Sequence, residues 1–283
     1  MNKTLLTDMN LQELETVVCE LGEQKFRAKQ LYKWLVKGVD FAQMSNISSS
    51  FIDKLSENYD AVGVRIYGEY KSKIDDTVKY LYKLRDGNVI EGVLMRYKYG
   101  NTLCVSTQVG CRMNCAFCAS GLDGLIRNLT AGEILGQVIA VNALNSTESQ
   151  RGVTNIVLMG SGEPLDNYGN VCKFLSLASD ENGLNISRRN VSLSTCGLCD
   201  KIRQLADDGY TPTMTISLHA PNDVMRQEIM PIAKKYSIDD IIGAVKYYFQ
   251  KTGRRIIFEY SMINGKNDGE SCAIQLAEKV KGL

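Results

Sequence analysis

The chain has 283 residues, of which 44% are hydrophobic and 23% are charged, and its net charge is +1. This composition is that of a soluble protein with a core large enough for one or two domains. A net charge near zero restricts any RNA-binding surface to a local patch. No apolar stretch reaches the ~20 residues of a membrane helix, and the N-terminus lacks the apolar segment of a signal peptide. We therefore expect a cytoplasmic protein without membrane contact, whose nine cysteines serve metal or redox chemistry.

The first sixty residues have the spacing of helices. Apolar residues recur on one face over residues 11–21, where Asn10 suits the N-cap and Gly22 the C-terminal stop. Further helices are expected at Lys25–Lys37 and Ser48–Asn58. The second helix carries a basic stripe of four lysines, spaced four apart: Lys25, Lys29, Lys33 and Lys37. This stripe is interpreted either as a solvated helix face or as a surface that contacts RNA phosphates.

The period of the apolar residues changes to that of strands between Val62 and Met95, and Asp86-Gly87 marks a hairpin turn. Basic residues alternate with tyrosines in this region. Such a mixture suits single-stranded RNA, and it also suits the wet face of an antiparallel sheet. We divide the chain near residue 100, into an α+β accessory domain at 1–100, expected to bind RNA, and a second domain at 101–283.

Strands and helices alternate from Thr102 onward. The helical stretches lie between five short apolar or β-branched runs, which are Thr102–Thr107, Val153–Met159, Asn190–Ser194, Thr213–Leu218 and Arg255–Tyr260. This alternation predicts an α/β fold of parallel strands with helices packed outside. Parallel β/α folds carry their active sites at the carboxyl ends of the strands, so polar residues there are candidates for function.

Three thiols lie within eight residues, at Cys111, Cys115 and Cys118, with the spacing C-x3-C-x2-C. Thiolates bind soft metals and iron–sulfur clusters. Four ligands usually hold a 4Fe–4S cluster, so three cysteines would leave one iron open for a small molecule. The alternative is a zinc site in which Cys104, seven residues upstream, supplies a fourth ligand.

This cysteine motif, with Phe117 before its last cysteine, resembles the signature of the radical S-adenosylmethionine (SAM) superfamily. The runs Cys104–Cys111 and Gly124–Glu133 resemble the narrower RlmN/Cfr family of RNA methyltransferases. The resemblance implies a partial β/α barrel, a 4Fe–4S cluster on the three cysteines, and SAM on the open iron. It further implies methylation of an adenine at C2, in 23S rRNA and tRNA, or at C8 in the Cfr branch. The second run resembles the C2 branch more closely.

The resemblance also implies SAM-binding roles for residues at or just after the ends of three of the strands. Taken alone, the glycine turn Met159–Pro164 is equally an ordinary βα loop, and a lone histidine is more often structural than catalytic. In the family, the turn holds the methionine amino group of SAM, and the other positions contact SAM without proton transfer. The matching residues are Gly162, Glu163, Ser194, Ser217, Leu218 and His219.

Two more residues match the family's catalytic positions. In that family a cysteine near the C-terminus is first methylated. The deoxyadenosyl radical made from a second SAM then removes a hydrogen from that methyl group, and the resulting methylene radical adds to adenine. Glu91 matches the proton acceptor, and Cys104 matches the thiol that resolves the covalent adduct by forming a disulfide bond. Without the resemblance, Glu91 is a solvent-facing strand residue. The family's sixth strand, a SAM-contacting Asn and the methyl-accepting cysteine have no match before Leu283, so we expect this chain not to complete methyl transfer.

The implied partners are 23S rRNA, tRNA and a flavodoxin-like electron donor that reduces the cluster, and we expect a monomer. A different class remains open, namely a metal-stabilised RNA-binding module without catalysis. Cys196 and Cys199 form a C-x2-C pair, but no second pair follows at zinc spacing, so we expect structural thiols. Cys172 and Cys272 lie in helical stretches and are expected to be buried.

Overall fold

The computed structural model describes residues 3–147 and 150–282, so residues 1 and 283, at the ends of the two expected domains, lie outside the described residues. The chain divides into two compact units that interleave along the sequence. The division near residue 100 stays a prediction. The first unit comprises Met1–Ser106, Leu129–Gly160 and Gly169–Asn190, and the second comprises Thr107–Asn128, Ser161–Tyr168 and Val191–Leu283.

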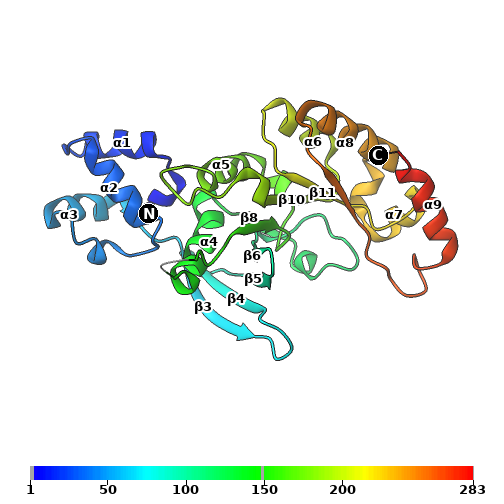
Figure 1. Ribbon diagram of the computed structural model, residues 1–283, viewed down its shortest axis with the longest axis horizontal. Helices are drawn as coiled ribbons and strands as arrows, with labels where there is room; N and C mark the ends of the chain where they lie inside the picture. The colour runs from blue at the N-terminus through cyan, green and yellow to red at the C-terminus, as the bar shows by residue number, and fades with distance from the viewer. Residues whose placement is uncertain (1–2, 148–149, 283) are drawn as a thin grey trace. The chain divides into compact units, whose positions relative to one another are not determined.

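The N-terminal part of the first unit is helical, as its apolar period predicted (Figure 1). Asn10 caps the first helix, because its side chain accepts from the N–H of Glu13 at 2.9 Å and the Glu13 carboxylate accepts from the N–H of Asn10 at 2.8 Å. Gly22 follows with φ of +77°, which suits glycine. Phe51 and Leu55 are fully buried in the core of this bundle. The helices are α1 (Leu11–Glu20), α2 (Phe26–Leu35) and α3 (Ser49–Asn58).

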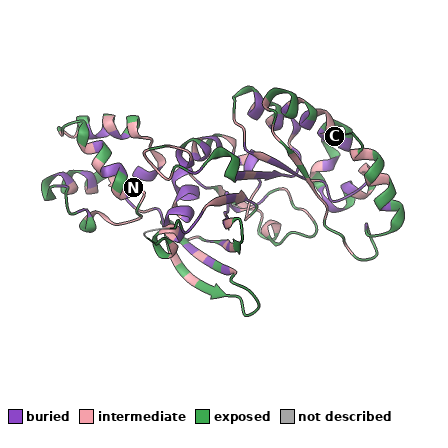
Figure 2. Cartoon of the chain, viewed as in Figure 1, coloured by how far each residue is buried: buried purple, intermediate pink, exposed green. Residues whose placement is uncertain are grey.

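A mainly antiparallel sheet forms the rest of the first unit, in the order β9-β6-β5-β4-β3. Along β4 the buried Tyr80 and Tyr82 alternate with the exposed Lys79 and Lys83, and Figure 2 shows this alternation of purple and green. One face of the sheet is therefore packed and the other is open to water. The strands are β3 (Val64–Lys71), β4 (Val78–Leu84), β5 (Val89–Tyr97), β6 (Gly100–Cys104) and β9 (Asn155–Leu158), with helices α4 (Ala131–Asn145) and α5 (Tyr168–Ala178).

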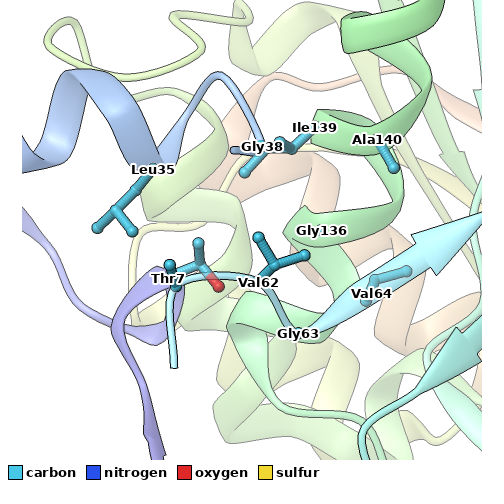
Figure 3. Close-up of a pocket in the computed structure, with 10 residues that line it drawn as sticks. Thr7, Leu35, Gly38, Val62, Gly63, Val64, Gly136, Ile139 and Ala140 are labelled. Carbon is cyan, nitrogen blue, oxygen red and sulfur yellow. The ribbon is translucent and has the colours of Figure 1, made fainter. Parts of the chain in front are cut away.

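Glycines let the N-terminal region approach α4 within the first unit (Figure 3). A Cβ on Gly136 would stand 2.9 Å from the Val64 side chain, and a Cβ on Gly63 would stand 2.5 Å from a Leu5 methyl group. The same seam contains the short pair of β1 (Thr4–Leu5) and β2 (Tyr59–Asp60). Only a cavity of about 20 Å³ remains, lined by Thr7, Leu35, Gly38, Ala61, Val62, Gly63, Val64, Gly136, Ile139 and Ala140.

The second unit contains three parallel strands with their carboxyl ends at one edge, since Thr195 lies opposite Ile216 and Ser217 opposite Glu259. Helix α8 begins with a capping box from Ser237, and it ends at Gly253, whose φ is +64°. No helix within residues 3–147 and 150–282 is long and apolar enough to span a bilayer. The elements are β7 (Gln108–Gly110), β8 (Leu125–Asn128), β10 (Val191–Thr195), β11 (Thr213–Ser217), β12 (Ile256–Glu259), α6 (Cys199–Asp207), α7 (Asp223–Ile229), α8 (Ile238–Thr252) and α9 (Glu270–Val280).

Candidate active site

The three motif cysteines lie in the loop that joins β7 to β8 in the second unit. Gly110 has φ of +74°, and a Cβ there would stand 1.9 Å from the carbonyl oxygen of Gly124. The N–H of the next residue, Cys111, donates to the same oxygen of Gly124 at 2.9 Å. Inside the loop, Asn114 takes a left-handed φ of +52°, which turns the chain between the first two thiols. The hairpin thus closes the base of the loop and keeps the cysteines on one short turn.

The donor set of this loop fits an iron–sulfur cluster chemically. Burial raises the pKa of Cys111, and burial together with the negative charge of the other two thiolates raises the pKa of Cys115 to about 12. Thiols in this state are protonated at neutral pH, and a bound metal has to displace their protons. In the described part of the chain, no three Cys, His, Asp or Glu side chains already converge on an ion position. The loop therefore offers three soft donors that a metal would gather.

The loop after β9 carries the predicted Gly162 and Glu163. Gly162 has φ of +107°, and a Cβ there would lie 2.6 Å from the Cβ of Gln108, so the position requires glycine. Glu163 is 4% exposed, and its carboxylate accepts from the N–H of Leu165 at 3.0 Å and of Cys196 at 2.8 Å. Burial raises the pKa of Glu163, while these amide donors oppose the shift. The carboxylate thus connects its own loop to the end of β10.

Two buried amide side chains hold this loop against β7. Gln108 accepts from the N–H of Glu163 at 2.9 Å and donates to the Asp166 carboxylate at 3.0 Å. Asn167 donates to the carbonyl oxygen of Thr107 at 2.9 Å. Gln108 and Asn167 are at most 2% exposed. The Gly162–Glu163 segment is therefore fixed on the strand that leads into the cysteine loop.

Hydroxyl and carboxylate groups meet at the ends of the three parallel strands. The predicted Ser194 and Ser217 lie with their Oγ atoms 3.3 Å apart. Both donate to Oε2 of Glu259, at 3.3 Å from Ser194 and 3.4 Å from Ser217. The sequence interpretation missed Glu259, although it ends a strand as both serines do. These three residues, from β10, β11 and β12, are called the serine–glutamate cluster below.

His219 follows β11 with an unusual left-handed φ of +57°. Its N–H and that of Leu218 donate to the carbonyl oxygen of Glu259, and Nδ1 accepts from the N–H of Ser261 at 3.0 Å. Burial, reinforced by the positive charge of Arg226, lowers the pKa of His219 to about 4. The imidazole is therefore neutral at physiological pH with its proton on Nε2, which suits a binding role. Its ring packs edge-on against Phe117 of the cysteine loop at 5.0 Å.

Glu91 and Cys104 lie in the first unit, on one face of neighbouring strands. Val93 pairs with Cys104, and Glu91 precedes Val93 by two positions, so both candidates point to the open side of the sheet. The carboxylate of Glu91 forms an ion pair with Lys79 of β4. Half of the Glu91 side chain, 51%, is exposed. The structure thus places a carboxylate, a thiol and an ammonium group on one face of the sheet, and Lys79 was not foreseen from the sequence.

All nine cysteines are within the described ranges, and none forms a disulfide. The expected disulfide is therefore wrong for this structure. The resemblance implies that disulfide as a step of the reaction, and Cys104 forms no disulfide among the described residues. Four thiols outside the motif are buried, as expected. Cys196, Cys199 and Cys272 lie in the second unit, and Cys172 lies in the first.

The basic stripe on α2 is shorter than the sequence suggested. Lys25 forms an ion pair with Glu15 of α1 at 3.0 Å, and Lys37 lies over the Trp34 ring at 4.5 Å from its centroid. The spacing of residues within one helix does not reveal an acidic residue on the neighbouring helix. Lys29, Lys33 and Lys37 remain exposed along one side of the helix.

Comparisons with known proteins agree with this geometry. Residues 105–275 match the radical SAM superfamily, and residues 4–60 match the ribosomal RNA large subunit methyltransferase N-terminal domain. A solved radical SAM methyltransferase from Sphaerobacter thermophilus superposes with a TM-score of 0.94 at 37% identity, covering 99% of this chain and 82% of that one. The chain is therefore a radical SAM protein, and the expected α/β fold of that type is confirmed.

Two relatives define the class further, both named as probable dual-specificity RNA methyltransferases RlmN. The protein of Lachnoclostridium phytofermentans is 49% identical over 97% of this chain and 76% of its own length. That of Clostridium botulinum, strain Eklund 17B, is 52% identical over 98% of this chain and 79% of its own. The chain belongs to the RlmN family.

Proposed function

We propose that this protein is a SAM-dependent RNA methyltransferase that modifies C2 of an adenine in 23S rRNA and in tRNA, by way of a methylated cysteine. The proposal is supported most by the second unit, where a three-thiol loop, a glycine turn and the serine–glutamate cluster surround the carboxyl ends of parallel strands. Identity of about 50% to the RlmN relatives supports RNA as the substrate. The finer choice of C2 rests on the family resemblance.

Cys111, Cys115 and Cys118 would hold a 4Fe–4S cluster, and SAM would bind beside it. When bound, the cluster and SAM would supply a radical that removes a hydrogen from the methylated cysteine, and this gives access to an electron-poor ring carbon that ordinary methyl transfer does not reach. The role of this chain's own residues would be to bind and orient SAM. The fixed Gly162–Glu163 segment would give close access for the methionine end of SAM, and the neutral His219, whose Nδ1 accepts from Ser261, would have Nε2–H as a donor to the ligand.

Glu91 is proposed as the proton acceptor and Cys104 as the thiol that releases the adduct. The two side chains share the open face of the first unit's sheet, where a substrate has access to them. The ammonium group of Lys79 forms an ion pair with the Glu91 carboxylate and holds it on this face of the sheet. A flavodoxin-like electron donor and a monomeric, cytoplasmic state complete the proposal.

The decisive experiment uses protein expressed from its whole gene and reconstituted anaerobically with iron and sulfide. It is given a reductant, SAM and a 23S rRNA fragment or tRNA, and nucleosides are analysed by mass spectrometry. Adenine methylated at C2, together with 5′-deoxyadenosine, is the expected result. Methylation at C8 would move the protein to the Cfr branch. A preparation with one zinc, no sulfide and no product would favour the metal-stabilised RNA-binding module.

We infer that the serine–glutamate cluster recognises the two ribose hydroxyls of SAM, because a carboxylate with two neighbouring hydroxyls can accept from a diol. Glu259→Gln is expected to weaken binding of S-adenosylhomocysteine at least about tenfold, since a hydrogen bond to a charged group contributes about 1.5–3 kcal/mol. Calorimetry on the reconstituted protein measures this loss. S-adenosylhomocysteine that lacks the 2′-hydroxyl should lose much less affinity on the same substitution. Equal losses for both ligands, or a similar loss in the exposed control Glu270→Gln, would contradict the assignment.

The exposed part of the α2 stripe is proposed as a phosphate-contacting surface. Replacing Lys29, Lys33 and Lys37 with glutamine should weaken RNA binding about equally for all sequences. The slope of log affinity against log salt should flatten by about two, as expected when three contacts to a single strand are lost. Fluorescence anisotropy at several salt concentrations measures both. The matched control replaces the exposed Lys246, Lys266 and Lys281 with glutamine. Equal effects of the two triple variants would show that the stripe is only a solvated helix face.

A further inference from the structure

Arg226 of α7 is a charged side chain enclosed in the second unit, and its exposure is 0%. All its hydrogen bonds go to main-chain carbonyl oxygens. Nε donates to Leu218 at 3.1 Å, and Nη2 donates to Cys196 at 2.7 Å and to Ser217 at 3.2 Å. The guanidinium therefore ties the ends of β10 and β11 together.

These contacts do not neutralise the charge. Within residues 3–147 and 150–282, no carboxylate forms an ion pair with Arg226, and its Nη1 has no hydrogen-bond partner. Desolvation of a cation is unfavourable by several kcal/mol in proteins unless a negative group lies nearby. The carboxylate of Asp223, one turn earlier on α7, acts on this cation through space without an ion pair. Three carbonyl dipoles and one unused N–H group leave the cation able to interact with a further anion.

The cysteine loop packs beside this cation. The N–H of Ala116 donates to the carbonyl oxygen of Ile229 at 2.9 Å, one turn after Arg226 on the same helix. Met113 and Cys115 pack against a buried cluster formed by Cys196, Ala220, Ile229 and Met230. The cation and the thiols therefore share one low-dielectric region.

We propose that Arg226 is the internal counter-charge of the thiolate-bound cluster, and that it raises the reduction potential of that cluster. A cluster held by three thiolates is anionic, and it gains one more negative charge on reduction. Net charge near a cluster is one of the factors that set its potential. A buried cation stabilises the reduced form more than the oxidised form. This inference rests on the proposed cluster site.

The test compares two substitutions in anaerobically reconstituted protein. Arg226→Met removes the charge at similar length, and Arg226→Lys keeps the charge but loses the planar fork that binds the carbonyl groups. The midpoint potential of the cluster is measured by a redox titration followed by electron paramagnetic resonance. Arg226→Met is expected to shift the reduction equilibrium at least tenfold toward the oxidised form, which is about 59 mV for one electron. Arg226→Lys should stay within threefold of the unsubstituted protein.

The control is Arg203→Met, which removes an exposed cation of the same unit and should leave the potential unchanged. An unchanged potential in Arg226→Met with full iron and sulfide would overturn the inference. If that variant does not fold, the lysine variant decides, because a tenfold shift there would make the carbonyl contacts responsible. Failure of the unsubstituted protein to bind iron and sulfide would instead refute the proposed cluster site.

Discussion

Replacing Cys115 with alanine is expected to abolish cluster assembly, because two thiolates remain in a loop that needs three. Cys115 lies in the middle of the loop and packs on the buried cluster beside α7, so no other cysteine of the loop takes its place without refolding. Iron and sulfide analysis after anaerobic reconstitution should fall to background. S-adenosylhomocysteine affinity should also fall, because the open iron supplies part of the SAM site in the proposal above.

Cys19→Ala is the matched control, since Cys19 is an exposed thiol on α1 in the other unit. It should retain the full iron and sulfide content. If Cys115→Ala also retained both, the ligand set would differ from the motif, and Cys104 would be the next thiol to replace.

Alanine in place of Gly162 is expected to lower the free energy of unfolding by about 3 kcal/mol. One part of this loss is the strain of a non-glycine residue at φ of +107°, and the other is the overlap with Gln108, whose Cβ would be 2.6 Å away. Relief of the overlap would also displace the neighbouring Glu163 from the amides that hold it. Urea unfolding followed by circular dichroism measures the stability, and calorimetry measures the accompanying loss of S-adenosylhomocysteine binding.

Gly169→Ala provides the comparison within the same chain. Gly169 lies in α5, and a Cβ there would meet no atom within 4 Å. Alanine at such a helical position usually stabilises by about 0.4–1 kcal/mol. Similar unfolding midpoints for the two variants would show that the turn at Gly162 adapts freely, contrary to the rigid geometry described above.

The sequence predicted the features that depend on neighbours along the chain. Apolar period and the Asn10 cap gave the first helix, and alternating β-branched runs gave β6, β9, β10, β11 and β12. Local glycine chemistry also placed the turn at Gly162. These features follow from backbone rules that act over a few residues, so a single sequence contains them.

The features that depend on register and packing were not predicted. Glu259 meets the two serines only because β12 pairs with β11 in one particular register. The burial of Arg226 depends on α7 covering the ends of β10 and β11, and a seven-residue helix shows too little periodicity to reveal its inner face. Likewise, Glu15 pairs with Lys25 because α1 packs on α2. Contacts between distant segments decide these cases.

The hydrogen bonds of Gln108, Glu163 and Asn167 have a consequence for the thermodynamics of ligand binding. Each side chain is buried and bonded to the main chain of its own or a neighbouring loop, so these loops lose their conformational entropy when the protein folds. A ligand that arrives later does not have to order them, and its affinity is not reduced by that entropic cost. In the SAM site that we propose, the rigidity of the glycine turn is thus a contribution to affinity that is made before the ligand binds.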